Sequence, residues 1–319
     1  MPLDRRAREF LLMLHRIDAP RMHELPIEIA RRNFDKMLFL YRGDAHEAVA
    51  ANDMSIPRRE HAGGALPVRI YRPACVGAES VPAMLWLHGG GWSLGNVNAY
   101  DPFCRALAEA SGVVVVALEY RLAPEHRFPA ALDDAWEALR WLRREFVTLN
   151  VDRARIAVGG DSAGGNLAAS LALMARDAGI VLAHQLLIYP AVDSLEELHP
   201  GMPYANQHFL DIDGLRWFRF NYLAAEADRR DWRASPARAP NHAGVAPALV
   251  ITAECDLLTA SAAAYANTLA QAGVVTCYRE IAGTIHGFMT FPRIFPVADD
   301  VIRFIASTLR ESFGLQEDV

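Results

Sequence analysis

The chain has 319 residues, of which 52% are hydrophobic, which is enough for one large α/β domain with an appended cap or for two domains. Its formal net charge of −6 provides no basic footprint for binding nucleic acid. Lys36 is the one lysine among 32 basic residues, so a P-loop and a serine–lysine dyad are excluded.

Residues 1–45 are expected to form helices, because charged positions alternate with apolar clusters and Pro20 and Pro26 break the run. We interpret them as the N-terminal part of a helical cap. The apolar run at residues 10–14 is too short for a signal sequence, so we predict a cytoplasmic protein without a targeting segment. No window of about 18 residues is uncharged and steadily apolar, so no membrane span is expected.

Residues 46–190 and 240–319 are predicted to form the main domain, because short apolar runs alternate there with helical stretches. This alternation is typical of a mostly parallel central sheet covered by helices on both faces. The predicted strands are residues 68–71, 84–87, 113–118, 155–158, 185–189, 248–252 and 274–281, and the clearest helices are residues 101–111, 130–146 and 261–272.

Residues 191–239 interrupt this alternation. A connection of this length with helices of its own is usually a lid or a binding element. We expect the insertion and the N-terminal helices to cap a site and to line an apolar pocket, with some aromatic rings only holding the cap together. The aromatic residues of the insertion are Tyr204, Phe209, Trp217, Phe218, Phe220, Tyr222 and Trp232.

The stretch Gly160-Asp161-Ser162-Ala163-Gly164 fits G-x-S-x-G, a sharp strand-to-helix turn that exposes a serine nucleophile. Its flanks agree, because a predicted strand precedes it and leucines follow at helical spacing. Glycine tolerates the crowded backbone two positions before and after the serine. The alternative is a glycine-rich junction with an incidental serine.

A run of three glycines, Gly89-Gly90-Gly91, follows the predicted strand at residues 84–87 and His88. Backbone N–H groups in such a loop stabilise the negative charge that develops on a carbonyl oxygen during acyl transfer. Our candidate donors to this oxyanion are the amides of Gly90, Gly91 and Ala163. Trp92 comes next and argues against a freely mobile surface loop. No other histidine or cysteine lies at ligand spacing from His88, so we interpret its ring as fixing the loop and expect no metal.

The order of residues along the chain indicates which histidine acts as the catalytic base. In G-x-S-x-G hydrolases the serine is followed by an acid and then by a histidine. His286 is the one histidine that follows a carboxylate at a strand end, after the predicted strand at residues 274–281. Asp256, beyond the predicted strand at residues 248–252, is our choice of acid, and Glu254 is the competitor. The acid holds the imidazole in its productive tautomer and stays ionised.

These residues resemble those of the bacterial hormone-sensitive-lipase-like esterases, which belong to the α/β-hydrolase superfamily. The resemblance covers roughly residues 60–310 and rests on four motifs, His88-Gly89-Gly90-Gly91-Trp92, Gly160-Asp161-Ser162-Ala163-Gly164-Gly165, Glu119-Tyr120-Arg121-Leu122-Ala123-Pro124-Glu125-His126 and His286-Gly287-Phe288. One departure is the run Leu257-Leu258-Thr259 after the proposed acid, where the family usually has a proline or a small apolar residue.

The resemblance implies an α/β-hydrolase fold with a helical cap, and makes residues 46–190 and 240–319 the catalytic domain. It implies a carboxylesterase that cleaves short- to medium-chain esters through a Ser162–Asp256–His286 triad, without a cofactor. Relatives often dimerise through a sheet edge, so the resemblance also makes a homodimer possible. We expect a small-molecule ester as substrate. Our candidate substrate-binding residues are Trp92, Phe209, Trp217 and Phe288.

Two other functions fit the same residues. The first is hydrolysis of amides or formamides on the same triad. The second is a catalytically silent small-molecule receptor, although such receptors on this fold have lost the histidine that this chain keeps at His286. The natural substrate, its chain length and its stereochemistry depend on the cap and do not follow from residue spacing.

Overall fold

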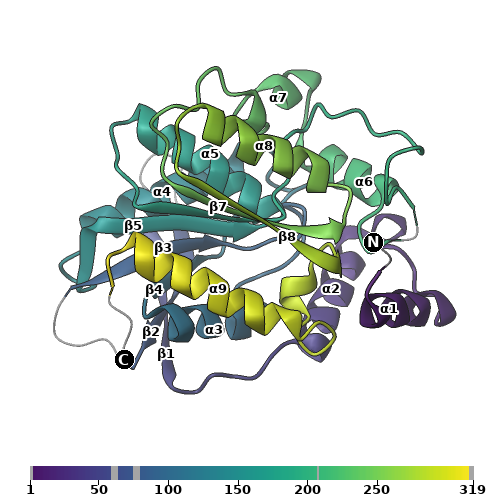
Figure 1. Cartoon of the computed structure of the whole chain (residues 1–319), viewed down its shortest axis with the longest axis horizontal. Coiled ribbons are helices and arrows are strands. Elements are labelled where there is room, and N and C mark those ends of the chain that lie inside the picture. The colour runs from purple at the N-terminus through teal and green to yellow at the C-terminus, as the bar shows by residue number, and fades with distance from the viewer. Residues whose placement is uncertain (1–2, 59–63, 75–79, 207, 316–319) are drawn as a thin grey trace.

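An eight-stranded sheet forms the centre of the computed structural model, which describes residues 3–58, 64–74, 80–206 and 208–315 (Figure 1). The strand order is β1-β2-β4-β3-β5-β6-β7-β8; β1 and β2 run antiparallel to their neighbours and the remaining pairs are parallel. The strands are β1 (Val49–Pro57), β2 (Ala65–Pro73), β3 (Val81–Leu87), β4 (Val114–Leu118), β5 (Val151–Asp161), β6 (His184–Ile188), β7 (Ala248–Cys255) and β8 (Thr276–Ile285).

The predicted fold class is confirmed, and each of the seven predicted strands overlaps an observed one. Strands β4 and β6 are buried along their whole length, as expected for parallel strands covered on both faces. The prediction missed β1. That edge strand is mostly exposed and carries Asn52, Asp53 and Ser55, so no apolar run marks it.

Helices cover both faces of the sheet. The helices are α1 (Arg5–Arg16), α2 (Ile27–Tyr41), α3 (Asp101–Ser111), α4 (Ala130–Arg144), α5 (Ala163–Asp177), α6 (Ile212–Tyr222), α7 (Glu226–Arg230), α8 (Thr259–Gln271) and α9 (Val297–Ser312), with short 3₁₀ turns η1 (Met22–Glu24), η2 (Pro236–Arg238) and η3 (Phe288–Thr290). Helices α3 and α9 pack together on one face, whereas α4, α5 and α8 lie on the other (Figure 1). Each face therefore has its own apolar core.

Two segments far apart in the chain meet at one end of the sheet. The 3₁₀ turn η1 contacts both α2 and α6 of the insertion, and α1, α2 and α6 lie at the same end of the molecule in Figure 1. An ion pair joins them, because Arg21 Nη1 lies 2.6 Å from Asp211 Oδ2, the N-cap residue of α6. Both segments are therefore positioned against each other as well as against the sheet.

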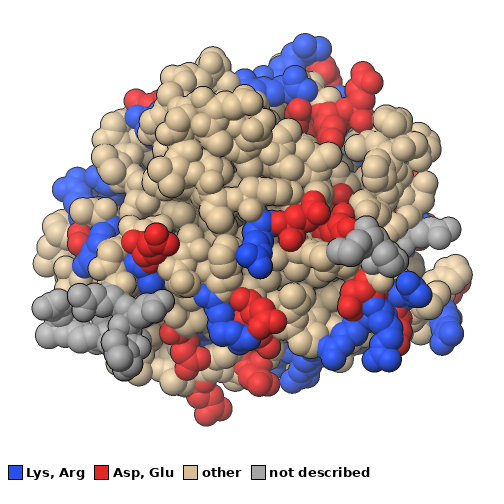
Figure 2. All heavy atoms as spheres, in the orientation of Figure 1, with Lys and Arg blue, Asp and Glu red and all other residues tan. Residues whose placement is uncertain are grey.

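The surface and the thiols bear on partners and redox chemistry. On the face seen in Figure 2, basic and acidic side chains are intermingled rather than separated by sign.

Among the described helices, none combines the length and the hydrophobicity that a bilayer crossing requires. Cys104, Cys255 and Cys277 are free thiols, and Cys75 lies outside the described residues.

Arg31 ties α2 to the main domain through four hydrogen bonds. Its guanidinium donates to the carbonyl oxygens of Ser93 and Ala123, each at 2.9 Å, and forms a bidentate pair with Glu125. Ser93 lies just after the glycine loop, so this side chain connects the N-terminal helices to that loop.

Replacing Arg31 should therefore destabilise the fold. We expect Arg31→Met to lower the free energy of unfolding by about 1.5–3 kcal/mol, the usual contribution of hydrogen bonds to a charged group. Urea denaturation followed by tryptophan fluorescence measures this. Arg32→Met, on the exposed side of the same helix, is the control and should stay within about 0.5 kcal/mol of the parent. Equal effects of the two substitutions would contradict the role of Arg31.

Candidate active site

Ser162 stands at the sharp turn between β5 and α5. Its backbone has φ 54° and ψ −115°, which non-glycine residues rarely adopt, and its N–H donates to the carbonyl oxygen of Ile188 at 2.8 Å. The turn requires glycine because of close approach. A Cβ atom at Gly164 would lie 1.9 Å from the Leu87 oxygen, and one at Gly160 would lie 2.4 Å from the Gly164 backbone.

A chain of two hydrogen bonds connects Ser162 to a buried carboxylate. His286 Nε2 lies 2.8 Å from Ser162 Oγ, and His286 Nδ1 lies 2.6 Å from Asp256 Oδ2. Asp256 follows the end of β7 and His286 follows the end of β8, so adjacent parallel strands deliver both side chains to the same edge of the sheet. The structure thus brings together the three residues that the sequence selected.

Glu254, the competing acid, points elsewhere. Its Oε2 accepts a hydrogen bond from the N–H of Gly283 at 2.7 Å, on the neighbouring strand β8. Glu254 lies within β7 and reaches across to β8, whereas Asp256 lies beyond the end of the strand, in the loop that faces His286. Asp256 is 4% exposed and also accepts from the N–H of Leu258 at 3.1 Å.

The candidate oxyanion donors face the same cavity as Ser162. Gly90, Gly91 and Ala163 all line it, and within the described residues none of their three N–H groups has an acceptor. Gly90 has φ 110° and Gly91 has φ 59°, so only glycine adopts this loop path without strain. Unpaired amides beside a serine can stabilise negative charge on a substrate oxygen.

His88 holds this loop in place. Its Nδ1 lies 2.8 Å from the Gly89 carbonyl oxygen, and its ring stacks on Tyr120 with centroids 4.3 Å apart. Burial lowers the pKa of His88, which favours the neutral imidazole. Across the described residues, no group of three or more histidine, cysteine or acidic side chains is arranged to hold a metal.

Asp161 is a second buried carboxylate at the site. It is 3% exposed and accepts hydrogen bonds from the N–H of Gly89 at 2.8 Å and from the hydroxyl of Tyr100 at 3.0 Å. Burial raises the pKa of Asp161 to about 6, against the opposing effect of these two donors and of His286. This carboxylate therefore joins the nucleophile turn to the first residue of the glycine loop.

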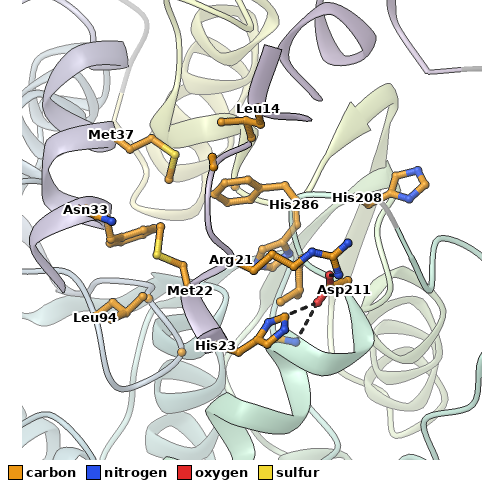
Figure 3. A pocket seen from close by; sticks show the side chains of 18 of the residues that line it. Leu14, Arg21, Met22, His23, Asn33, Met37, Leu94, His208, Asp211 and His286 are labelled. Atoms are coloured by element: carbon orange, nitrogen blue, oxygen red, sulfur yellow. Dashed lines mark hydrogen bonds and ion pairs between the residues drawn. The ribbon is translucent and has the colours of Figure 1, made fainter. Parts of the chain in front are cut away.

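The site opens into a cavity of about 1170 Å³ (Figure 3). Met37 and Leu94 lie on one side of it, and the polar residues Arg21, His23 and Asp211 lie on the other. Asn33 and Lys36 of α2 also line the cavity, so polar and apolar side chains occur together on its wall.

The four candidate substrate-binding residues divide into two pairs. Trp92 and Phe209 line the cavity, although Trp92 is only 2% exposed and stacks on Tyr222 with centroids 4.4 Å apart. Trp217 and Phe288 are not among the cavity-lining residues of the described chain. Phe288 is fully buried behind Tyr189, and Trp217 packs beside Phe218 instead.

Several residues at the cavity were not among the four candidate substrate-binding residues. Phe218 is the clearest: it was named only among the aromatic residues of the insertion, and helical spacing could have selected it. Leu215, Phe218 and Tyr222 recur three and then four positions apart, so they share one face of α6, whereas Trp217 is rotated away from it. No comparable pattern in the sequence marks Arg21 or Asp211 as residues that line the cavity.

A family model for the alpha/beta hydrolase fold matches residues 84–290. An ethyl acetate hydrolase of Pseudomonas putida is 39% identical over 297 residues, covering 91% of this chain and 92% of its own. The carboxylesterase NlhH of Mycobacterium tuberculosis is 40% identical over 238 residues, covering 73% and 74%.

Solved structures agree with these relatives. The hyperthermophilic esterase of the archaeon Pyrobaculum calidifontis superposes with a TM-score of 0.89 at 37% identity, covering 98% of this chain and 99% of its own. A point mutant of an α/β hydrolase from the metagenome of Lake Arreo has a TM-score of 0.92 at 36% identity, with the same coverage.

The raised pKa of Asp161 predicts a pH dependence of stability. Between about pH 4 and pH 6 the folded protein binds a proton at Asp161 that the unfolded chain releases, so stability falls as the pH rises through this window. The loss should approach about 3 kcal/mol. In Asp161→Asn this group does not titrate, so the difference in unfolding free energy between the two proteins should change with pH. A constant difference from pH 4 to pH 7 in urea titrations would refute the assignment.

Proposed function

We propose, given that this chain belongs to the hormone-sensitive-lipase-like esterases of the α/β-hydrolase family, that it is a serine carboxylesterase acting through an acyl-enzyme. One observation carries the proposal. The hydrogen-bonded series from Asp256 through His286 to Ser162 ends at a cavity that Gly90, Gly91 and Ala163 also line, and the amides of these three residues have no acceptor in the described part of the chain. A nucleophile, its base and an oxyanion site are the parts that acyl transfer needs.

In the first half-reaction, His286 Nε2 accepts the proton of Ser162 Oγ as the oxygen attacks the ester carbonyl carbon. The carbonyl oxygen becomes an oxyanion and accepts hydrogen bonds from the amides of Gly90, Gly91 and Ala163. Asp256 stays ionised and stabilises the imidazolium. When the tetrahedral intermediate collapses, the carbon–oxygen bond to the alcohol breaks, and His286 gives its proton to the departing oxygen.

In the second half-reaction, water takes the place of the alcohol. His286 Nε2 accepts a proton from the water as its oxygen attacks the acyl carbon of the Ser162 ester. The same amides stabilise the second oxyanion. Collapse breaks the bond to Ser162 Oγ, which recovers its proton from His286 and releases the carboxylic acid.

The cavity supports an apolar acyl or alcohol group of short to medium length. Part of its lining consists of aliphatic and thioether side chains, which favour hydrocarbon over water. These include Leu11, Leu14, Met22, Met37 and Leu94. The relatives named above are described as acting on esters, which agrees with this chemistry.

Removing the nucleophile is the direct test. Ser162→Ala should lower kcat for p-nitrophenyl butyrate by roughly 10⁴–10⁶-fold, because the variant lacks the hydroxyl that lies beside His286 Nε2. A spectrophotometric assay of nitrophenol release measures this. Turnover at the parental rate in Ser162→Ala would disprove the proposal.

The choice of acid has its own test. Asp256→Asn should reduce kcat by about 10⁴-fold, because the amide favours the wrong imidazole tautomer. Glu254→Gln, two residues earlier in β7, is the matched control and should lose far less activity, since its carboxylate accepts from the N–H of Gly283. If Glu254→Gln proves the more damaging change, Asp256 is the wrong acid.

A further inference from the structure

Phe218 projects from α6 toward the active site. It shares a helix face with Leu215 and Tyr222, both of which are buried, and it lines the cavity that contains Ser162. Phe220, two positions later, is 71% exposed and does not line the cavity among the described residues. Two phenylalanines of one helix therefore have opposite surroundings.

The ring of Phe218 lies directly against the glycine loop. A Cβ atom built on Gly91 would be 2.0 Å from Phe218 Cδ1 and 2.4 Å from its Cε1, so the ring occupies the space where a side chain at position 91 would go. The N–H of Gly91 is one of the proposed oxyanion donors. A carbonyl oxygen bound there therefore brings the neighbouring part of the substrate close to this ring.

Packing holds the ring in this position. Phe218 contacts Trp217 edge to face with centroids 5.1 Å apart, and it packs against the cluster formed by Leu210, Leu215 and Leu258. Leu258 lies two residues after Asp256, so the ring is wedged between the oxyanion loop and the loop of the acid.

The helix that carries Phe218 is itself fixed to the glycine loop. One turn further along α6, the Tyr222 ring stacks on Trp92, the residue after Gly91, at an interplanar angle of 1°. The Tyr222 carbonyl oxygen accepts a hydrogen bond from the N–H of Phe128 at 2.8 Å. The distance between Phe218 and Gly91 is thus set by rigid contacts on both sides, as expected for a wall that selects by shape.

We propose that Phe218 is a specificity-determining residue that limits branching at the carbon atom next to the ester group. A linear chain bends away from the ring, whereas a branched carbon places an extra methyl group against it. The effect concerns the acyl side, the alcohol side or both, because either substituent is attached at the reacting centre. This inference rests on the proposed esterase activity.

Pairs of isomeric esters test the inference. For the acyl side, p-nitrophenyl pivalate is compared with p-nitrophenyl valerate, and for the alcohol side sec-butyl acetate is compared with n-butyl acetate. In Phe218→Ala, the ratio of kcat/KM for the branched isomer to that for the linear isomer should rise at least about tenfold for one or both pairs, the lower end of what a missing methyl contact changes. The pair of esters whose ratio rises shows whether the ring limits branching on the acyl side or on the alcohol side of the ester.

Phe220→Ala is the matched control. Its ring lies outside the cavity, with the Arg127 guanidinium 5.6 Å from its centroid, so the ratios should stay at their parental values. If Phe218→Ala does not fold, Phe218→Leu removes part of the ring while keeping an apolar side chain, and its ratios should rise by a smaller factor.

The outcomes are separable. A parent that hydrolyses the linear esters, with ratios unchanged in a folded Phe218 variant, overturns the inference and leaves the esterase proposal intact. A parent that hydrolyses none of the four esters contradicts the esterase proposal and the inference together. A raised ratio in Phe220→Ala as large as that in Phe218→Ala also overturns the inference, because the effect is then not local to the ring against Gly91.

Discussion

The site depends on one close contact between two backbone segments. The carbonyl oxygen of Leu87, at the end of β3, approaches Gly164 so closely that no side chain fits between them. This contact seats the start of α5 against the strand that leads into the glycine loop. It places Ser162 beside Gly90 and Gly91, and Asp161 strengthens it by accepting from the N–H of Gly89. The proposed nucleophile and the proposed oxyanion donors, which come from separate βα turns, are thereby brought together in one site.

The second determinant is the proposed cap, whose two parts, the N-terminal helices and the insertion at residues 191–239, are far apart in the chain. Arg21 pairs with Asp211 across 190 residues, and Arg31 reaches Glu125 and the carbonyl oxygen after the glycine loop. Trp92 and Tyr222 stack where the insertion meets that loop. The cavity walls are thus coupled to the glycine loop, so changes in the proposed cap should affect both the space for substrate and the position of the Gly90 and Gly91 amides.

Much of this arrangement could be predicted from sequence, for identifiable reasons. Buried parallel strands are continuous apolar runs, so seven strands were predicted, whereas the exposed edge strand with Asn52 and Asp53 was not. Ser162, Asp256 and His286 were selected by motif and chain order, and the structure brings them together. The cap was harder. Choosing Phe218 over Trp217 needs the phase of α6, and no local pattern shows which arginine pairs with Asp211.

Covalent trapping of the nucleophile tests the central claim most directly. A p-nitrophenyl alkylphosphonate should release one equivalent of nitrophenol per chain, and peptide mass spectrometry should locate the phosphonate on Ser162. His286→Ala should abolish this labelling while the fold persists, because the serine then lacks its base. Labelling at a different residue, or full ester hydrolysis by a protein that the phosphonate does not modify, would contradict the account.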